Sequence, residues 1–313
     1  MIPLLERAIG LYHFLGDRTP RGAPLVSPRP RPANPWLKGE KVLVSRVAAG
    51  ADIRATVEKS IGLLGGLEPA IERGDRVLVK PNFNSPDPPP AATDPGFLRA
   101  VVEILKEAGA RVTIGECSGG FWRPTRNVLQ KLGIIELARD LGVELVAFED
   151  SKQGWVKVKI GGDYLDTVTV PRLAYEADKI VYLPCLKTHS YARFTGALKL
   201  AVGLMHPGER RSLHASSLEP KVAEIALSLL PNLIIMDGRK AFVSGGPDQG
   251  ELVEPGLVLA SGDPVALDVE AMKVLLAYGA KNKMEPDPWQ SAQIVTALRH
   301  NLGAREGGYI IVE

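Results

Sequence analysis

Basic side chains that can bind an anion gather in one glycine-bearing stretch of the sequence, residues 177–214. The apolar run at 180–183 is typical of a buried strand, and Pro184 should end that strand because proline cannot donate to a sheet ladder. The stretch carries Lys187, Thr188, His189, Arg193, Thr195, Lys199, His206, Arg210, Arg211 and His214. In α/β proteins, ligands bind beyond the carboxyl ends of the strands. The pattern therefore predicts an anion-binding loop; the alternative is a solvated basic surface loop.

Other predicted strands also end in polar side chains. They deliver Lys80 and Asn82, Glu116 and Ser118, and Asp237. In a parallel sheet these ends lie along one edge, so we expect the side chains to converge there. A lysine ammonium would meet an anion at that edge as a point charge, whereas a surface lysine that only covers apolar neighbours is the alternative.

Four side chains are candidates for catalysis: Lys187, His189, Glu116 and Asp237. Lys187 and His189 are two residues apart, so they face the same side of an extended segment. A lysine near other cations can lose its proton and act as a base or an amine nucleophile, and a neutral histidine can accept a proton or bind a metal. His189 and His214 are the candidate ligands for a divalent or transition metal, but no HxH or HxxxH spacing demands a metal site.

Two glycine-rich turns add backbone N–H groups that can bind an anion. GECSGG at 115–120 follows a predicted strand, where it resembles an anion nest, and a second turn spans 244–250. Cys117 lies in the first turn, where a packed, inert cysteine is favoured over a nucleophile. The predicted substrate-binding residues are Lys80, Asn82, Ser118, Gly119, Thr195, Lys199, Gly245 and Gly246.

The alternation of strands and helices predicts an α/β fold of the Rossmann-like type, with a mostly parallel sheet, flanking helices, two α/β lobes and an inserted β-hairpin at 155–170. The expected strands are 41–47, 76–79, 111–114, 143–148, 179–183, 232–236, 257–260 and 309–312. The expected helices are 52–64, 94–109, 124–141, 219–230, 263–278 and 289–299. We expect a Pro- and Arg-rich arm at 1–39, the α/β domain at 40–280, and a C-terminal helix and strand packed on it at 281–313.

The composition excludes several classes of protein. With 313 residues, 45% of them hydrophobic, the chain can bury a large core, and its net charge of +2 argues against a nucleic-acid binder. The two cysteines form no CxxC pair, so one chain cannot build a Cys-ligated zinc site or a four-cysteine iron–sulfur cluster. Without an apolar run of about 18 residues or a signal sequence, we expect a cytoplasmic protein with no membrane contact. Its N-terminal arm offers a route to a homo-oligomer.

Motifs in order along the chain are similar to those of the DUF362 family, whose general function is unknown, over about residues 40–280. They are VLVKPN at 77–82, ATDP at 92–95, GECSGG at 115–120, ADKIVYLPCLKTH at 177–189, TGALK at 195–199, the strand with Asp237, GGPDQG at 245–250 and SGDPVALD at 261–268. Many members of that family carry ferredoxin-like cysteine motifs, which this chain lacks, so the resemblance implies no intrinsic iron–sulfur cluster here. The chain also has Glu116-Cys117 where Asp-Ser is frequent, and Lys199-Leu200 where Lys-Asn is common.

The order of a strand, KTH, a glycine-rich segment, GLM and then His214 also resembles, more distantly, the lactate racemase family. That resemblance implies a nickel-pincer nucleotide cofactor attached to a lysine, with histidines around the nickel. Lys187, Lys199, His189 and His214 are the candidates for those roles.

Three functions are consistent with the sequence. The first is an enzyme that binds a small carboxylate or phosphate at the convergent strand ends and transfers a proton next to a carbonyl, with or without a metal. A non-catalytic protein that binds an anion or a cofactor in the same pocket is the second. The third is a redox protein that shares an external iron–sulfur cluster through Cys117 and Cys185.

Overall fold

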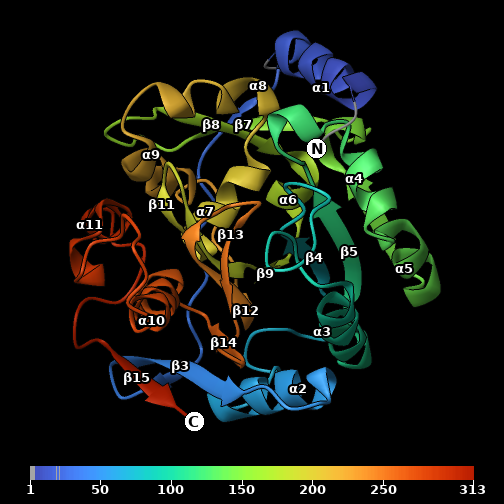
Figure 1. Cartoon of the computed structure of the whole chain (residues 1–313). Helices are drawn as coiled ribbons and strands as arrows, with labels where there is room; N and C mark the ends of the chain where they lie inside the picture. Colours follow the sequence, from blue (N-terminus) through green and yellow to red (C-terminus); the bar gives the residue numbers. More distant parts are fainter. Residues whose placement is uncertain (1–3, 19, 21) are drawn as a thin grey trace.

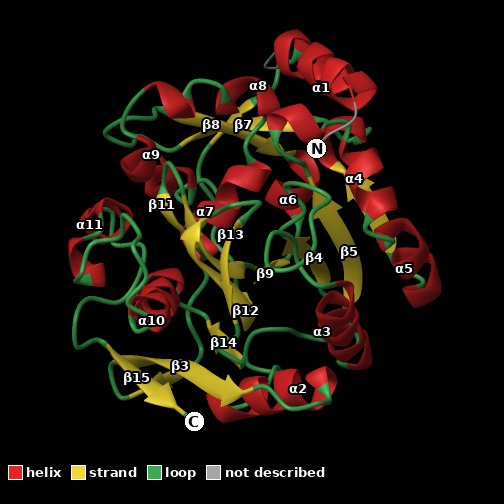
Figure 2. Ribbon diagram, viewed as in Figure 1, coloured by secondary structure: helices red, strands yellow, loops and turns green. Residues whose placement is uncertain are grey.

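The computed structural model, which describes residues 4–18, 20 and 22–313, is built on one sheet of twelve strands (Figures 1 and 2). Its main path has the order β15-β3-β14-β12-β9-β4-β5-β6. The strands of this sheet are β2 (Leu37–Lys38), β3 (Lys41–Ala48), β4 (Arg76–Pro81), β5 (Arg111–Glu116), β6 (Glu144–Ala147), β9 (Lys179–Leu183), β10 (Cys185–His189), β11 (Arg193–Thr195), β12 (Leu233–Gly245), β13 (Gly250–Val253), β14 (Leu257–Ser261) and β15 (Tyr309–Val312). From β12 to β6 the neighbours run parallel, whereas β14 is antiparallel to both β12 and β3.

Helices cover both faces of this sheet (Figure 1). They are α2 (Ile53–Leu64), α3 (Pro95–Glu107), α4 (Thr125–Lys131), α5 (Ile134–Leu141), α6 (Arg172–Glu176), α7 (Ala197–Leu200), α8 (Pro207–Arg210), α9 (Leu218–Ile225), α10 (Pro264–Leu276) and α11 (Ala292–Arg299). Because successive side chains of a strand point to opposite faces, Val77 and Val79 of β4 join the core under α2 to α5, and Leu78 joins the core under α7 and α9 to α11. The predicted α/β fold with a large, mostly parallel sheet flanked by helices is confirmed; the two lobes and the domain limits stay predictions.

Local sequence signals account for the ends of several helices. The carboxylates of Asp52, Asp94 and Asp263 accept hydrogen bonds from the first backbone N–H groups of α2, α3 and α10, as N-cap residues do. The single helix predicted at 124–141 is wrong: it is divided into α4 and α5. Gly133 separates them with a φ of 71°, a left-handed conformation that glycine adopts without strain.

The basic segment after Pro184 differs most from the prediction. The chain does not leave the sheet there, because β10 follows directly and pairs with β12 in parallel and with β11 antiparallel. Pro184 fits because its carbonyl oxygen accepts a hydrogen bond from the backbone N–H of Asp237, and no donor is needed from proline at that point. Lys187 and His189 therefore lie on a buried strand and not in a loop.

The predicted hairpin is confirmed, but it lies outside the main sheet. Strands β7 (Trp155–Lys159) and β8 (Thr167–Pro171) are antiparallel and form a separate sheet with β1 (Leu25–Val26) of the N-terminal arm. Arg31 of the arm donates hydrogen bonds to the backbone carbonyls of His300 and Asn301. The arm thus wraps over the chain's own surface, and its role in an oligomer stays a prediction.

Helix α1 (Leu4–Gly16) packs on the short helix η1 (Gly120–Trp122), at the top of Figure 1. Within the part of the chain that the structure describes, no helix combines the length and the apolar character needed to cross a membrane.

Candidate functional site

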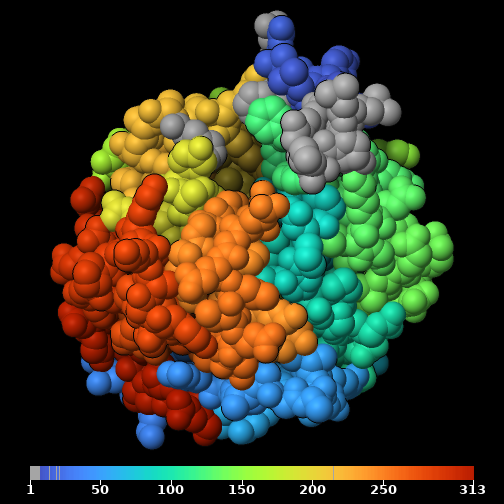
Figure 3. Space-filling view, in the orientation of Figure 1, coloured from blue at the N-terminus to red at the C-terminus, as the bar shows by residue number. Residues whose placement is uncertain are grey.

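The carboxyl ends of β4, β5 and β10 open into a cavity of about 480 Å³. Its other walls come from α7, the short helices η3 (Ala201–Leu204) and η4 (Leu213–Ala215), α9, and the turn between β12 and β13. Figure 3 shows the gold, orange and teal segments that supply these walls side by side on one face of the molecule. Eight of the predicted site residues line the cavity: Lys80, Asn82, Glu116, Gly119, Lys187, His189, Thr195 and Lys199. The predicted convergence of these strand ends is therefore present.

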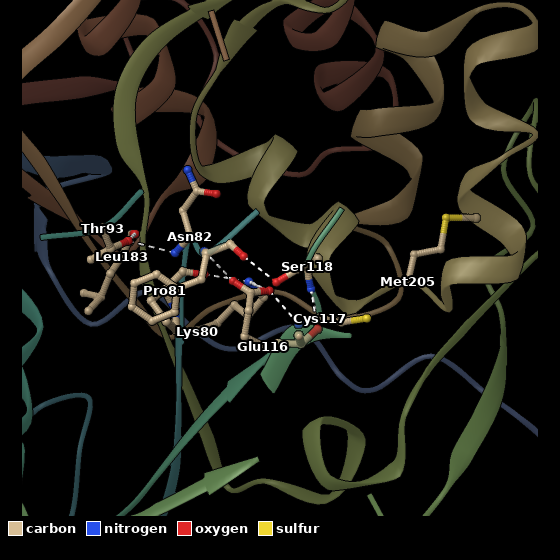
Figure 4. Close-up of polar contacts among 12 residues, drawn as sticks. Lys80, Pro81, Asn82, Thr93, Glu116, Cys117, Ser118, Leu183 and Met205 are labelled. Atoms are coloured by element: carbon tan, nitrogen blue, oxygen red, sulfur yellow. Dashed lines mark hydrogen bonds and ion pairs between the residues drawn. The ribbon is translucent and has the colours of Figure 1, made fainter. Parts of the chain in front are cut away.

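Lys80 and Glu116 form a buried ion pair at the floor of the cavity (Figure 4). The Nζ of Lys80 lies 2.6 Å from Glu116 Oε1, and the two side chains are 1% and 2% exposed. Glu116 also accepts hydrogen bonds from the backbone N–H groups of Phe83 and Cys117, at 2.7 Å each. Burial lowers the pKa of Lys80, and the nearby Glu116 charge opposes that shift. Each charge is already neutralised within the protein, so this ion pair shapes the floor of the cavity, and the predicted role of Glu116 as a base has no support in this geometry.

Gly203 of η3 lies directly against this ion pair. A β-carbon at this position would be 2.7 Å from Cε and Nζ of Lys80, and 3.2 Å from Glu116 Oε1. Such distances are too short for van der Waals contact, so only glycine lets η3 approach the floor of the cavity this closely.

Replacing Gly203 with alanine is expected to lower the free energy of unfolding by about 1–3 kcal/mol, because the added methyl group displaces the buried ion pair. Gly62→Ala is the matched control: Gly62 lies in helix α2 with no heavy atom near its β-carbon position. That control should leave the stability unchanged or raise it by up to about 1 kcal/mol. Chemical unfolding followed by circular dichroism measures both, and equal effects of the two substitutions would contradict the close packing at Gly203.

Of the three lysines that line the cavity, Lys187 and Lys199 have no described carboxylate in ion-pair contact, whereas Lys80 does. The Nζ of Lys187, on β10, donates to the carbonyl oxygen of Ala91 at 2.6 Å, and the residue is 1% exposed. Lys199, on α7, is partly exposed and forms no hydrogen bond or ion pair with any described residue. Burial lowers the pKa of both lysines, and for Lys199 burial and the adjacent Lys187 charge lower it to about 8.

His189 ends β10 with its ring at the cavity wall. Its Nδ1 accepts hydrogen bonds from the backbone N–H groups of Tyr191 and Ala192, at 3.1 and 3.0 Å. An Nδ1 that accepts carries no proton, so in the neutral ring the proton is on Nε2. The Nε2–H group is then a hydrogen-bond donor and not a metal ligand.

A nickel site of the kind implied by the likeness to lactate racemase is not formed by the described residues. His189 presents a protonated Nε2, and the side chain of His214 lies outside what the structure describes. In the described part of the chain, the residues close enough to share a metal are Asp163, Glu224 and His300, which do not line the cavity. Glu224 there already accepts hydrogen bonds from the backbone N–H groups of residues 163–165. We therefore derive no step through a metal.

Asp237 is not part of the cavity, contrary to its predicted catalytic role. Strand β12 continues past it to Gly245, so Asp237 does not lie at a strand end. Its carboxylate pairs with Arg239 at 2.7 Å, and the same guanidinium lies 3.1 Å from Asp94 at the N-terminus of α3. Asp237 thus orients Arg239, and Arg239 links β12 to the start of α3.

The predicted anion nest in GECSGG has no free donors among its first amides. The backbone N–H of Cys117 donates to the Glu116 carboxylate, that of Ser118 to the Thr125 hydroxyl, and that of Gly119 to the Asn84 carbonyl. Of this turn, Ser118 does not line the cavity, because its hydroxyl donates to the Phe83 carbonyl.

The two cysteines are packed and inert. Burial raises the pKa of the Cys117 thiol and of the Cys185 thiol, which keeps both protonated near neutral pH. The nucleophile interpretation of Cys117 and the shared iron–sulfur cluster both need an accessible thiolate, so neither has support at these positions.

Gly245 and Gly246 do not line the cavity either, but they place a residue that does. Gly246 packs against the Thr188 carbonyl with no room for a β-carbon, and the turn then brings Asp248 to the cavity. The Oδ1 atom of Asp248 is buried and has no hydrogen-bond partner among the described residues. Burial lowers the pKa of both Lys187 and Lys199, and the Asp248 charge opposes that shift. Sequence reasoning missed Asp248, although an acid between the glycines of GGPDQG was the available signal.

Arg210 was named as a basic residue of the stretch but not as part of the site. Its guanidinium donates to the backbone carbonyls of Cys117, Ser118 and Gly203, at 2.8, 3.1 and 2.9 Å. Arg210 therefore fixes η3 to the GECSGG turn and holds the wall of the cavity in place.

Helix α7, which carries Lys199, is held by Asp268 of α10. The Asp268 carboxylate accepts hydrogen bonds from the backbone N–H groups of Ala197 and Leu198, at 2.6 and 3.0 Å. Gly196 lies against the same carboxylate with no room for a β-carbon. Burial raises the pKa of Asp268 from its ordinary value of 3.8 to about 7.

This raised pKa predicts a pH-dependent stability. The protonated Asp268 is favoured in the folded state, so its contribution is fully present below pH 3.8 and is lost as the pH rises to about 7. In that window the free energy of unfolding should fall by at most about 1.4 kcal/mol per pH unit from this group. Chemical unfolding at several pH values should give a flatter profile for Asp268→Asn than for the wild type. Parallel profiles would show that Asp268 titrates normally.

Comparison with known proteins shows which family and which relatives this chain matches. Residues 77–273, which include Lys80, Lys187 and Lys199, match the family described as domain of unknown function DUF362. Thylakoid-associated protein sll1697 of Synechocystis sp. is 27% identical over 248 residues, which cover 76% of this chain and 75% of that protein.

Two solved structures resemble part of this chain. The lactate racemase apoprotein from Thermoanaerobacterium thermosaccharolyticum has a TM-score of 0.46 at 14% identity over 76% of this chain. A protein from Thermotoga maritima has a TM-score of 0.44 at 15% identity over 72% of this chain. The chain spans 58% of the length of each of these structures. The match over residues 77–273 includes every residue that lines the cavity except Asp17, and most of the central sheet, and the protein therefore belongs to the DUF362 family.

Proposed function

We propose that this protein is an enzyme that binds a small carboxylate or phosphate in the cavity and transfers a proton to or from the bound molecule. The observation that carries the proposal is the pair Lys187 and Lys199, whose ammonium groups face one cavity without an ion pair to a described carboxylate. A buried charge without an ion-pair partner, such as that of Lys187, costs several kcal/mol. A fold keeps such groups where a ligand supplies the missing negative charge.

Lys199 is the candidate for the proton transfer. Its pKa of about 8 leaves part of the amine neutral near neutral pH, so it can accept a proton from a carbon next to a carbonyl. Lys187 is held by the Ala91 carbonyl and is the anchor for the anion. The Nε2–H group of His189 donates a hydrogen bond to the same ligand.

Deuterium exchange tests the proposal. The protein would be incubated in D₂O with a panel of 2-hydroxy, 2-oxo and 2-amino carboxylates. NMR would follow the proton signal at C2 of the hydroxy and amino acids and at C3 of the oxo acids. We expect the signal of at least one compound to be lost with the wild type and to be retained with Lys199→Met. Lys159→Met, which removes an exposed lysine of the hairpin, should exchange like the wild type.

The same experiment separates the alternatives. Binding of a carboxylate or of phosphate at Lys187 and Lys199 without any exchange would favour the non-catalytic anion-binding protein. No binding of either anion by calorimetry would overturn both forms of the proposal.

A further inference from the structure

The cavity has two chemically different sides. Its floor, at the ends of β4, β5 and β10, is polar and carries Lys80 and Lys187. Another wall is formed by the short helices α7 to α9 and the segments between them; it carries Lys199, Arg210 and Arg211, but most of its lining residues are apolar. The apolar residues of this wall are Leu200, Val202, Pro207, Leu213, Leu218 and Val222.

The apolar residues of this wall belong to the hydrophobic core or pack against it, and they are not isolated exposed side chains. Leu200, Leu213 and Val222 are buried members of the core under α7 to α11, at 5%, 1% and 0% exposure. Val202 and Leu218 pack against the same core. Side chains held by a packed core keep a fixed surface, so the wall is preformed.

A small hydrophilic anion would use only the polar floor. Water molecules that stay next to the apolar wall add nothing to the free energy of binding. Each apolar group of a ligand that replaces them removes apolar surface from solvent, which favours binding. Ligand sites of this volume usually combine an apolar lining with a few polar groups that fix the orientation.

We propose that the natural ligand is an amphipathic anion, with one carboxylate or phosphate head at Lys187, the carbon that exchanges its proton near Lys199, and a hydrocarbon body along the apolar residues of the wall. The inference rests on the proposed function and adds the class of the ligand. The aromatic residues Phe121 and Tyr191 line the same cavity but are 52% and 74% exposed, so they mark its mouth, where a longer body leaves the protein.

A series of straight-chain carboxylates from acetate to octanoate tests the inference, with each affinity measured by calorimetry near neutral pH. We expect the affinity to rise roughly threefold to fourfold per methylene until the chain fills the wall. Octylammonium, which has the chain but the opposite charge, should bind at least about 30-fold more weakly than octanoate, because two lysines repel it.

Substitutions test which residues bind the charged head of the ligand and which bind its hydrocarbon body. Leu218→Gln or Val202→Thr should flatten the dependence on chain length and leave the affinity for acetate unchanged. Leu252→Gln, an exposed leucine outside the cavity, is the control and should change neither. Lys187→Met should weaken every member of the series by a similar factor.

Each outcome decides between the inferences. Acetate binding with a flat chain-length dependence in the wild type would overturn the amphipathic ligand and leave the proposed function standing. Octanoate binding that survives Lys187→Met and Lys199→Met together would overturn the anion head itself, and with it the proposed function.

Discussion

Replacing Lys80 with methionine is expected to lower the free energy of unfolding by about 3–5 kcal/mol, because it leaves the Glu116 carboxylate buried without its ammonium partner. The two groups are 2.6 Å apart and almost fully buried, so solvent cannot take over the lost interaction. Guanidinium unfolding followed by circular dichroism measures the change.

Two comparisons make this prediction specific. The exposed pair of Lys159 and Asp166 is 2.5 Å apart with side chains 54% and 69% exposed, so Lys159→Met should cost less than about 1 kcal/mol. The double variant Lys80→Met/Glu116→Gln should recover part of the loss, since it removes both charges together. A Lys80→Met protein as stable as the Lys159→Met control would show that the pair is not a structural element.

Replacing Lys187 with methionine is expected to have the opposite effect: anion binding is lost, whereas the free energy of unfolding is kept. Lys187 is as buried as Lys80, but its ammonium forms no ion pair with a described carboxylate. Methionine removes the cost of that buried charge and gives up one hydrogen bond to the Ala91 carbonyl, to which Asn82 also donates at 3.5 Å. The free energy of unfolding should therefore stay within about 1 kcal/mol of the wild type, or rise.

The loss of binding is measured with inorganic phosphate or acetate by calorimetry. Removing a charged hydrogen-bond donor from the anion should weaken binding by about 10- to 100-fold. Lys159→Met again serves as the matched control. A Lys187→Met protein that is strongly destabilised but binds phosphate normally would make Lys187 a structural residue and would remove the anchor from the proposed function.

Lys80 and Lys187 show what the local sequence can and cannot predict about a functional site. Both follow apolar runs, and each was predicted to meet an anion at the end of its strand. Only the structure separates them, because the Glu116 carboxylate that neutralises Lys80 arrives on β5, from 36 residues further along the chain. Nothing in the residues next to a lysine reveals whether such a partner will be present.

The sequence by itself determined the α/β class, the helix starts at Asp52, Asp94 and Asp263, the hairpin, and the strand that delivers Lys80 to the cavity. These features depend on the period of apolar side chains and on the chemistry of single residues, which are local. The tertiary structure alone decided that β10 forms, that Asp237 lies outside the cavity and that Asp248 lines it. They depend on pairing between segments about 50 or more residues apart, such as Cys185 with Asp237, and such pairing follows from which surfaces fit together in the packed chain.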